Sequence, residues 1–125
     1  MGLGDVNGKV LPKVSLLSKS INKNSILSRY FTPYSCHETH AVTGTCCVAS
    51  SCLIPGTIGF NLLKKNESLD LKSEIIKIEH PMGTIDCSII LNSNFKNNLI
   101  SKKNLINSCG VYRTSRILMK GQVYF

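Results

Sequence analysis

The chain has 125 residues, of which 42% are hydrophobic, and 15 basic against 7 acidic residues give it a net charge of +8. This length predicts one domain or a piece of a larger one, and the apolar content excludes a disordered chain. The excess of lysine is compatible with nucleic acid, an acidic membrane surface or an anionic small molecule as a partner. Because no aromatic residues interleave with a basic stripe, the pattern argues against nucleic-acid binding.

Two strands are predicted in the first third of the chain. The first covers 9–19, where valine and leucine recur around Pro12, and the second covers 25–35, which is rich in aromatic and β-branched residues. Pro33 within the second run indicates an edge or a bend. The glycines before the first strand predict only a turn.

The uncharged stretch Ala41–Phe60 (AVTGTCCVASSCLIPGTIGF) predicts a buried helix at about 40–54, ended by Pro55 and Gly56 and followed by a short helical turn at 57–63. Its proline, glycine and polar residues are too frequent for a membrane span. The helix start at Thr43-Gly44-Thr45 has two interpretations. Either a threonine caps the helix, or the free N–H groups of the first turn form a cradle for a carboxylate.

The second half predicts a hairpin and two further strands, all antiparallel. His80-Pro81-Met82-Gly83 is a tight turn between two strands with apolar alternation. The predicted strands are 74–79, 84–91, 105–114 and 117–125, with surface loops at 64–73 and 92–104. The sum is an α+β fold in which antiparallel strands surround one central helix.

Six cysteines invite a disulfide framework, but the start of the chain lacks the apolar core of a signal peptide. We therefore expect reduced cysteines packed in the core of a cytoplasmic protein, with Cys36 the most exposed of them. Cys36, His37 and His40 near Cys46 and Cys47 form one ragged cluster without a second Cys/His pair, so neither a metal site nor a catalytic cysteine is predicted.

Two of the three arginines, Arg113 and Arg116, lie in the stretch RTSRILMKG near the C-terminus. Their apolar neighbours predict that at least one of them is partly buried and paired. The pair is either an internal salt bridge or a bidentate contact with the carboxylate of a ligand.

Three stretches, in this order, resemble the C-terminal part of the PrpF family, which includes 2-methylaconitate cis-trans isomerase and 4-oxalomesaconate tautomerase. They are AVTGTCCVASSCLIPGT, HPMGTIDCSI and VYRTSRILMKGQVYF. The sequence departs from the family pattern at Met82, where serine is usual, at Cys46, where glycine is usual, and at Ser115, where alanine is usual.

The resemblance implies a diaminopimelate epimerase-like fold of two similar domains with the active site between them, so that residues 1–125 are a partial C-terminal domain. It also implies a set of substrate-binding residues, namely Thr43, Gly44, Thr45, His80, Gly83 and Arg113. In the related epimerases a cysteine stands at the position of Thr43. The lysine and cysteine that transfer protons in PrpF proteins belong to an N-terminal domain outside these residues, so no catalytic residue is assigned here.

The implied reaction is a cofactor-free double-bond or cis/trans isomerisation of an unsaturated di- or tricarboxylic acid. The partners expected are that small acid and either the missing N-terminal domain or a second copy, with no nucleic acid and no membrane. The 125 residues alone are expected to be inactive. The alternatives are a non-catalytic remnant that keeps the fold and a basic binding module.

Overall fold

The structure, a computed structural model, describes residues 2–63, 73–92 and 105–125. The predicted loops at 64–73 and 92–104 fall outside these residues, apart from Ser73 and Asn92. The helices and strands, in chain order, are β1 (Val14–Lys19), β2 (Ser25–Phe31), α1 (Val42–Ser51), α2 (Ile58–Leu63), β3 (Ser73–His80), β4 (Gly83–Leu91) and β5 (Ile106–Val111).

The five strands form one sheet in the order β1-β2-β3-β4-β5. Three of the four neighbouring pairs are antiparallel, but β2 and β3 run parallel, with Ser25–Leu27 opposite Lys77–Glu79. The expectation of a purely antiparallel sheet is therefore wrong. A parallel pair needs a crossover long enough to return the chain to the starting end, and here α1 and α2 lie in that connection.

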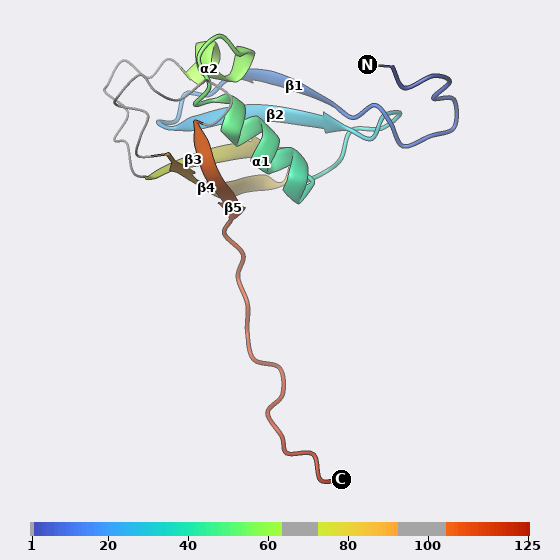
Figure 1. The fold of residues 1–125 in the computed structure, drawn as a ribbon, viewed down its shortest axis with the longest axis vertical. Helices are drawn as coiled ribbons and strands as arrows, with labels where there is room; N and C mark the ends of the chain where they lie inside the picture. The colour runs from blue at the N-terminus through green and yellow to red at the C-terminus, as the bar shows by residue number, and fades with distance from the viewer. Residues whose placement is uncertain (1, 64–72, 93–104) are drawn as a thin grey trace.

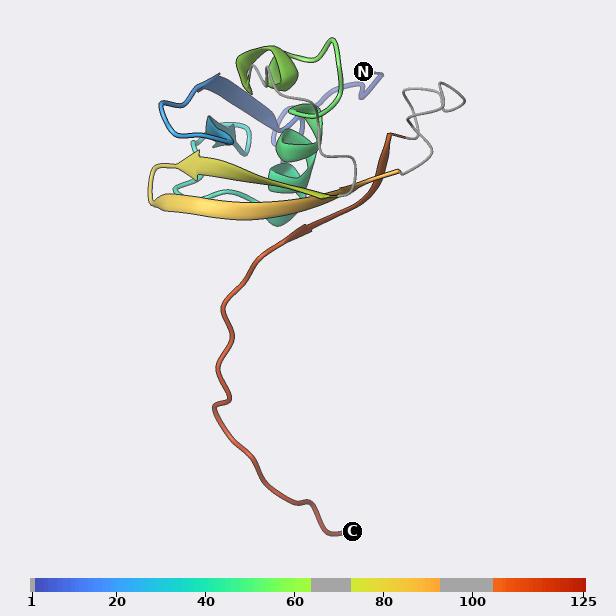
Figure 2. The same cartoon turned by 90° about the vertical axis from the view of Figure 1, so that its left-hand side faces the viewer.

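Both helices cover the same face of the sheet, with α1 packed on β3, β4 and β5 and α2 packed near β1 and β2 (Figures 1 and 2). Side chains alternate between the two faces of a strand. In β3, Ile76 and Ile78 are therefore fully buried, while Ile75 and Lys77 lie on the opposite face. The core is completed by Cys87 and Ile89 of β4 and by residues of α1, including Val48 and Ala49.

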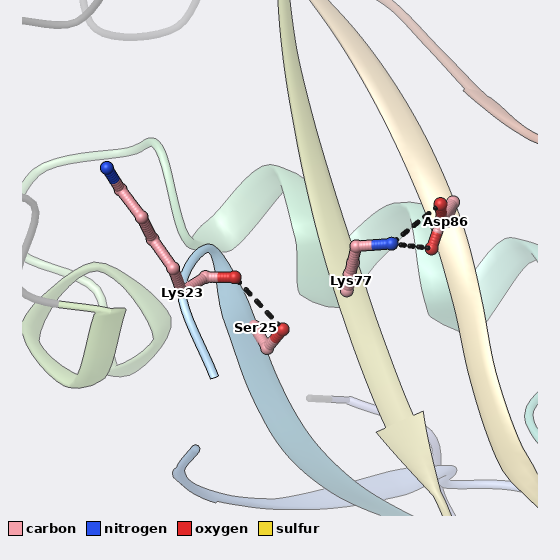
Figure 3. A network of polar contacts seen from close by, with 4 residues as sticks. All are labelled: Lys23, Ser25, Lys77 and Asp86. Carbon is pink, nitrogen blue, oxygen red and sulfur yellow. Dashed lines mark hydrogen bonds and ion pairs between the residues drawn. The ribbon is translucent and has the colours of Figure 1, made fainter. Parts of the chain in front are cut away.

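On the outer face of the sheet, Lys77 of β3 and Asp86 of β4 occupy opposite register positions (Figure 3). Their side chains form an ion pair of 3.0 Å. Because both side chains remain well exposed, solvent screens the pair and its contribution to stability is under about 1 kcal/mol. The burial of isoleucine on the other face therefore matters more for the stability of this hairpin.

The predicted central helix, the short helix after it and the hairpin are confirmed, with shifted ends. The helix covers 42–51 rather than 40–54, and Gly56 after it adopts a φ of 89° that favours glycine. The first strand begins only at Val14, and the second ends at Phe31, two residues before Pro33. Within the described residues, neither helix is both apolar enough and long enough to cross a bilayer.

The predicted strand at 117–125 is wrong. After β5 ends at Val111, residues 112–125 have no regular secondary structure and extend away from the sheet (Figure 1). Alternating apolar residues cannot form a strand unless their backbone finds a neighbouring strand to pair with. The apolar side chains of this segment are all strongly exposed, and they are Ile117, Leu118, Met119, Val123, Tyr124 and Phe125.

We expect Ile76→Ala to lower the free energy of unfolding by about 2–5 kcal/mol, because it leaves a cavity between β3 and α1. The neighbouring Ile75 is 44% exposed on the opposite face. Ile75→Ala is the matched control and should cost less than about 1 kcal/mol. Urea denaturation of both variants measures the difference, and equal losses would contradict the placement of α1.

Candidate functional site

The first turn of α1 has no side-chain cap. Its N-cap residue is Ala41, and there is no acidic residue in the first turn. The interpretation in which a threonine caps this helix is therefore wrong, since Thr43 and Thr45 both lie inside the helix. The N–H groups at the start of an α-helix lack intrahelical partners and carry the positive end of the helix dipole. This end of α1 is thus suited to a negatively charged group.

Thr45 faces inward. It is fully buried, and its hydroxyl donates a hydrogen bond of 3.0 Å to the carbonyl of Ala41 and lies 3.1 Å from Nδ1 of His40. Of the residues that the resemblance assigned to substrate, Thr45 is therefore the one whose hydroxyl contacts the protein itself. It holds the histidine that precedes the helix.

His40 is buried between β2 and α1. Its Nε2 lies 3.0 Å from the hydroxyl of Ser28, its Nδ1 lies 3.2 Å from the carbonyl of Ala41, and its ring lies 4.7 Å from the ring of Tyr30. With the Thr45 hydroxyl donating to Ala41, the consistent assignment places the proton on Nδ1, so that Nε2 accepts from Ser28. Burial lowers the pKa of His40, and the charges of His80 and His37 lower it further.

Gly44 is required by this packing. A Cβ at position 44 would lie 2.6 Å from Cε2 of Tyr30 and 3.2 Å from Cε1 of His40. Carbon atoms do not approach so closely, and the Tyr30 ring is itself buried. The glycine at the centre of Thr43-Gly44-Thr45 therefore lets β2 and His40 lie directly against the first turn of α1.

A hollow of about 380 Å³ adjoins this turn and brings together residues of β1, β2, α1 and the chain leading into β1. Its lining residues are Lys13, Ser15, Tyr30, Thr43, Gly44, Cys47 and Val48. Two of the predicted substrate residues, Thr43 and Gly44, are therefore at one site. Sequence reasoning missed Lys13 and Ser15, although their spacing of two along an extended run places both on one face.

Cys47 was expected in the core and is exposed instead, while its neighbour Cys46 is half-buried and Cys52 is fully buried as expected. A helix turns by about 100° per residue, so adjacent residues cannot share one buried stripe. Cys36 is exposed, also as expected, and all six cysteines are free thiols.

His80 and Gly83 lie at the hairpin between β3 and β4. Gly83 has a φ of 140°, which only glycine adopts readily, so the turn itself requires this residue. The Met82 N–H donates a hydrogen bond of 3.3 Å to Nδ1 of His80. Burial lowers the pKa of His80, and the nearby Glu38 carbonyl partly offsets this effect.

Arg113 lies in a second hollow of about 490 Å³. That hollow is lined by Lys77, Thr84, Ile85, Asp86, Tyr112, Arg113 and Thr114. The expectation that Arg113 or Arg116 is partly buried is wrong: both are exposed, because they follow the end of β5, where the sheet no longer covers the chain. The six predicted residues are thus divided between the first turn of α1, the β3–β4 hairpin and this hollow.

A different cluster is formed by sulfur. The Sγ atoms of Cys46, Cys87 and Cys109 all lie within 4.8 Å of one another. No sequence pattern predicts this cluster, because its members come from α1, β4 and β5 and only the fold brings them together. The Cys/His cluster around Cys36 and His40 that was considered from the sequence differs from this one. There, the ring nitrogens of His40 contact Ser28 and Thr45.

Residues 9–125 match the family described as PrpF protein. The chain is 35% identical over 124 residues to "Putative isomerase YbhH" of Escherichia coli (strain K12), covering 99% of this chain and 32% of that protein. It is 32% identical over 123 residues to the 4-oxalomesaconate tautomerase of Pseudomonas putida, covering 98% of this chain and 30% of that enzyme.

A third relative, the (4E)-oxalomesaconate Delta-isomerase of Novosphingobium sp., is 32% identical over 124 residues, covering 99% of this chain and 31% of that enzyme. These relatives all carry the names of isomerases or tautomerases. The chain belongs to the PrpF family. It spans about a third of the length of the curated relatives it matches.

We expect Gly44→Ala to destabilise the chain by about 1–2 kcal/mol. Overpacking against Tyr30 costs about 1–3 kcal/mol, and the better helix propensity of alanine returns up to about 1 kcal/mol. Gly110→Ala is the control, because a Cβ at position 110 meets nothing within 4 Å. Thermal denaturation compares the two, and a more stable Gly44→Ala variant would show that Tyr30 does not rest against this turn.

We also expect stability to fall as the pH drops below 6.5, the ordinary pKa of histidine, because the unfolded chain then takes up protons that buried His40 and half-buried His80 resist. This stability is fully present above that pH and is lost progressively down to the lower pKa of the folded state. Glu79 does not contribute there, because hydrogen bonds from Asn22 and Ser20 hold its pKa below 4.5.

The measurement is urea denaturation at several pH values between about 8 and about 5, with an NMR titration of the His40 ring. His80→Gln serves as the control, since it should reduce the pH dependence without abolishing it. A His40 ring that titrates above its ordinary pKa, or a chain that becomes more stable on acidification, would contradict the buried neutral imidazole.

Proposed function

We propose that this chain is the substrate-binding part of a PrpF-type isomerase with a diaminopimelate epimerase-like fold. The reaction is a cofactor-free shift of a double bond, or of its cis/trans geometry, in an unsaturated di- or tricarboxylic acid. The observation that carries the proposal is the uncapped first turn of α1 beside a hollow lined by Thr43, Gly44 and Lys13. The names of two of the relatives, which refer to oxalomesaconate, support the substrate class.

The hollow offers three kinds of group that favour a carboxylate. Backbone N–H groups of the first turn of α1 donate to it, the hydroxyls of Thr43 and Ser15 add side-chain donors, and Lys13 supplies a positive charge. Proton abstraction next to a carboxylate develops negative charge on its oxygens. Donors that are already oriented stabilise this charge without reorganising during the reaction.

The other residues assigned to substrate take supporting positions in this proposal. His80 and Gly83 form the β3–β4 hairpin, and Thr45 orients His40 behind the helix. Arg113 lies in the second hollow, where in this proposal it grips a carboxylate bidentately. The groups that carry the proton, a lysine and a cysteine, are proposed to come from a preceding domain.

The test measures binding of 4-oxalomesaconate and of 2-methylaconitate to the 125-residue chain by calorimetry, with isomer conversion followed by NMR. We expect binding without conversion. Lys13→Gln and Thr43→Val should each weaken binding roughly tenfold or more, because a hydrogen bond to a charged group contributes about 1.5–3 kcal/mol. Lys9→Gln removes the same charge outside the hollow and should leave binding unchanged.

Two outcomes would overturn different parts of the proposal. Binding that responds equally to Lys13→Gln and Lys9→Gln would show general charge attraction instead of a site. Conversion by the isolated chain, abolished by Cys47→Ala, would place a proton-transferring group in this hollow and contradict the assignment of catalysis to a preceding domain.

A further inference from the structure

The three-cysteine cluster lies on the core side of the sheet, where α1 crosses β4 and β5. Cys87 is fully buried, and Cys46 and Cys109 are half-buried. The Sγ atoms of Cys87 and Cys109 are 3.3 Å apart, and the Cys109 thiol donates a hydrogen bond of 3.7 Å to the carbonyl of Cys46. The cluster is thus closed toward the core and open on the side of the two half-buried thiols.

The spacing of the sulfurs suits a single ion. Since no two sulfurs are more than 4.8 Å apart, some point lies within about 2.8 Å of all three, and a thiolate–zinc bond is about 2.3 Å long. Small rotations of the cysteine side chains, which move each sulfur by a few tenths of an ångström, close this difference. The three ligands come from three elements, so the fold has already brought them together before any ion binds.

We propose that Cys46, Cys87 and Cys109 form a binding site for one thiophilic metal ion of the Zn(II) or Cu(I) type. Soft thiolate ligands select these ions over magnesium, calcium or manganese. Cu(I) accepts three sulfurs alone, whereas Zn(II) requires a fourth ligand, which the open side of the cluster leaves to solvent or a small thiol. The site is separate from the hollow at the first turn of α1 and does not depend on the proposed isomerase function.

Binding of the metal ion releases protons from the cysteine thiols. Burial raises the pKa of Cys46 and of Cys87, so these two thiols are protonated without metal. Binding forms three metal–sulfur bonds, and up to three protons leave to solvent. Three thiolates leave a net charge of −1 with Zn(II) and −2 with Cu(I). The smaller buried charge favours Zn(II), and the number of sulfur ligands favours Cu(I).

The competing use of these sulfurs is a disulfide between Cys87 and Cys109, whose thiols are already in contact. In the register of the sheet Cys109 pairs with Ile89 and Cys87 pairs with Val111, so the two cysteines are diagonal neighbours. A disulfide would leave Cys46 alone and prevent the site from forming. Metal binding and this oxidation therefore exclude each other, and a test must begin with reduced protein.

The experiment uses the 125-residue chain carrying Cys36→Ser and Cys47→Ser, which removes the two exposed thiols that bind metal adventitiously. The reduced protein is titrated with Cd(II), whose thiolate charge-transfer absorption reports sulfur ligation. Separate titrations use Zn(II) and Cu(I) against competing chelators, with native mass spectrometry for stoichiometry. We expect one ion per chain and a higher thermal midpoint with metal.

Cys46→Ser and Cys109→Ser, added singly, should each weaken binding by more than about a hundredfold, since losing a ligand costs no less than losing an outer-shell partner. Cys52→Ala is the matched control, because Cys52 is a buried thiol of the same region outside the cluster. It should bind metal with unchanged affinity. Circular dichroism without metal shows whether each variant is folded.

Cadmium absorption that survives in Cys46→Ser and Cys109→Ser, or reduced parent protein that binds no ion, would overturn the proposal. So would a protein in which dissolved oxygen oxidises Cys87 and Cys109 to a disulfide as fast with metal as without it. The Zn(II) and Cu(I) titrations decide between the two ions, since the one bound more tightly against its chelator is the preferred ligand of the site.

Discussion

The structure depends on the buried contact of His40 with β2 and α1. The imidazole lies between the Ser28 hydroxyl and the Thr45 hydroxyl, and its ring stacks at a tilt on Tyr30. A buried imidazole is tolerated only when it is neutral and both nitrogens have partners, and these conditions are met here. The contact attaches the start of α1 to the end of β2. The first turn of the helix thereby acquires a defined position with its N–H groups uncapped.

The crossover between β2 and β3 explains where α1 lies on the sheet. A parallel connection carries the chain over one face of the sheet, so α1 packs across β3, β4 and β5. An antiparallel meander would have left no helix across β3, β4 and β5.

The sequence predicted the local elements well and their long-range relations less well. The uncharged run with Pro55-Gly56 at its end predicted α1, and the alternation around Ile76 and Ile78 predicted the hairpin. The parallel pair was missed because strand direction depends on distant pairing that local patterns do not encode. The strand at 117–125 was predicted from residue type alone, and backbone pairing decided against it.

The same distinction holds for the sites. Thr43 and Gly44 were proposed from the local pattern of a helix start and from the family resemblance, but the reason for Gly44 is the Tyr30 ring, which only the fold brings near. Lys13 and Ser15 were missed because an exposed lysine before a strand has no distinguishing pattern. Cys87 and Cys109 lay in predicted strands, where cysteine reads as a small apolar residue.

The adjacent residues Cys46 and Cys47 of α1 belong to two different regions, the sulfur cluster and the hollow. The helical rotation between them directs Cys47 to the hollow and Cys46 to the sulfur cluster. One side of this turn of α1 therefore packs on β4 and β5. Its other side lines the hollow that contains Thr43 and Lys13. An ion held by Cys46, Cys87 and Cys109 would tie this turn to the sheet and restrict how far the wall of the hollow can move. The pattern of the family that the sequence resembles has glycine at position 46. A glycine there would offer no metal ligand, whereas Cys46 supplies a sulfur to the cluster.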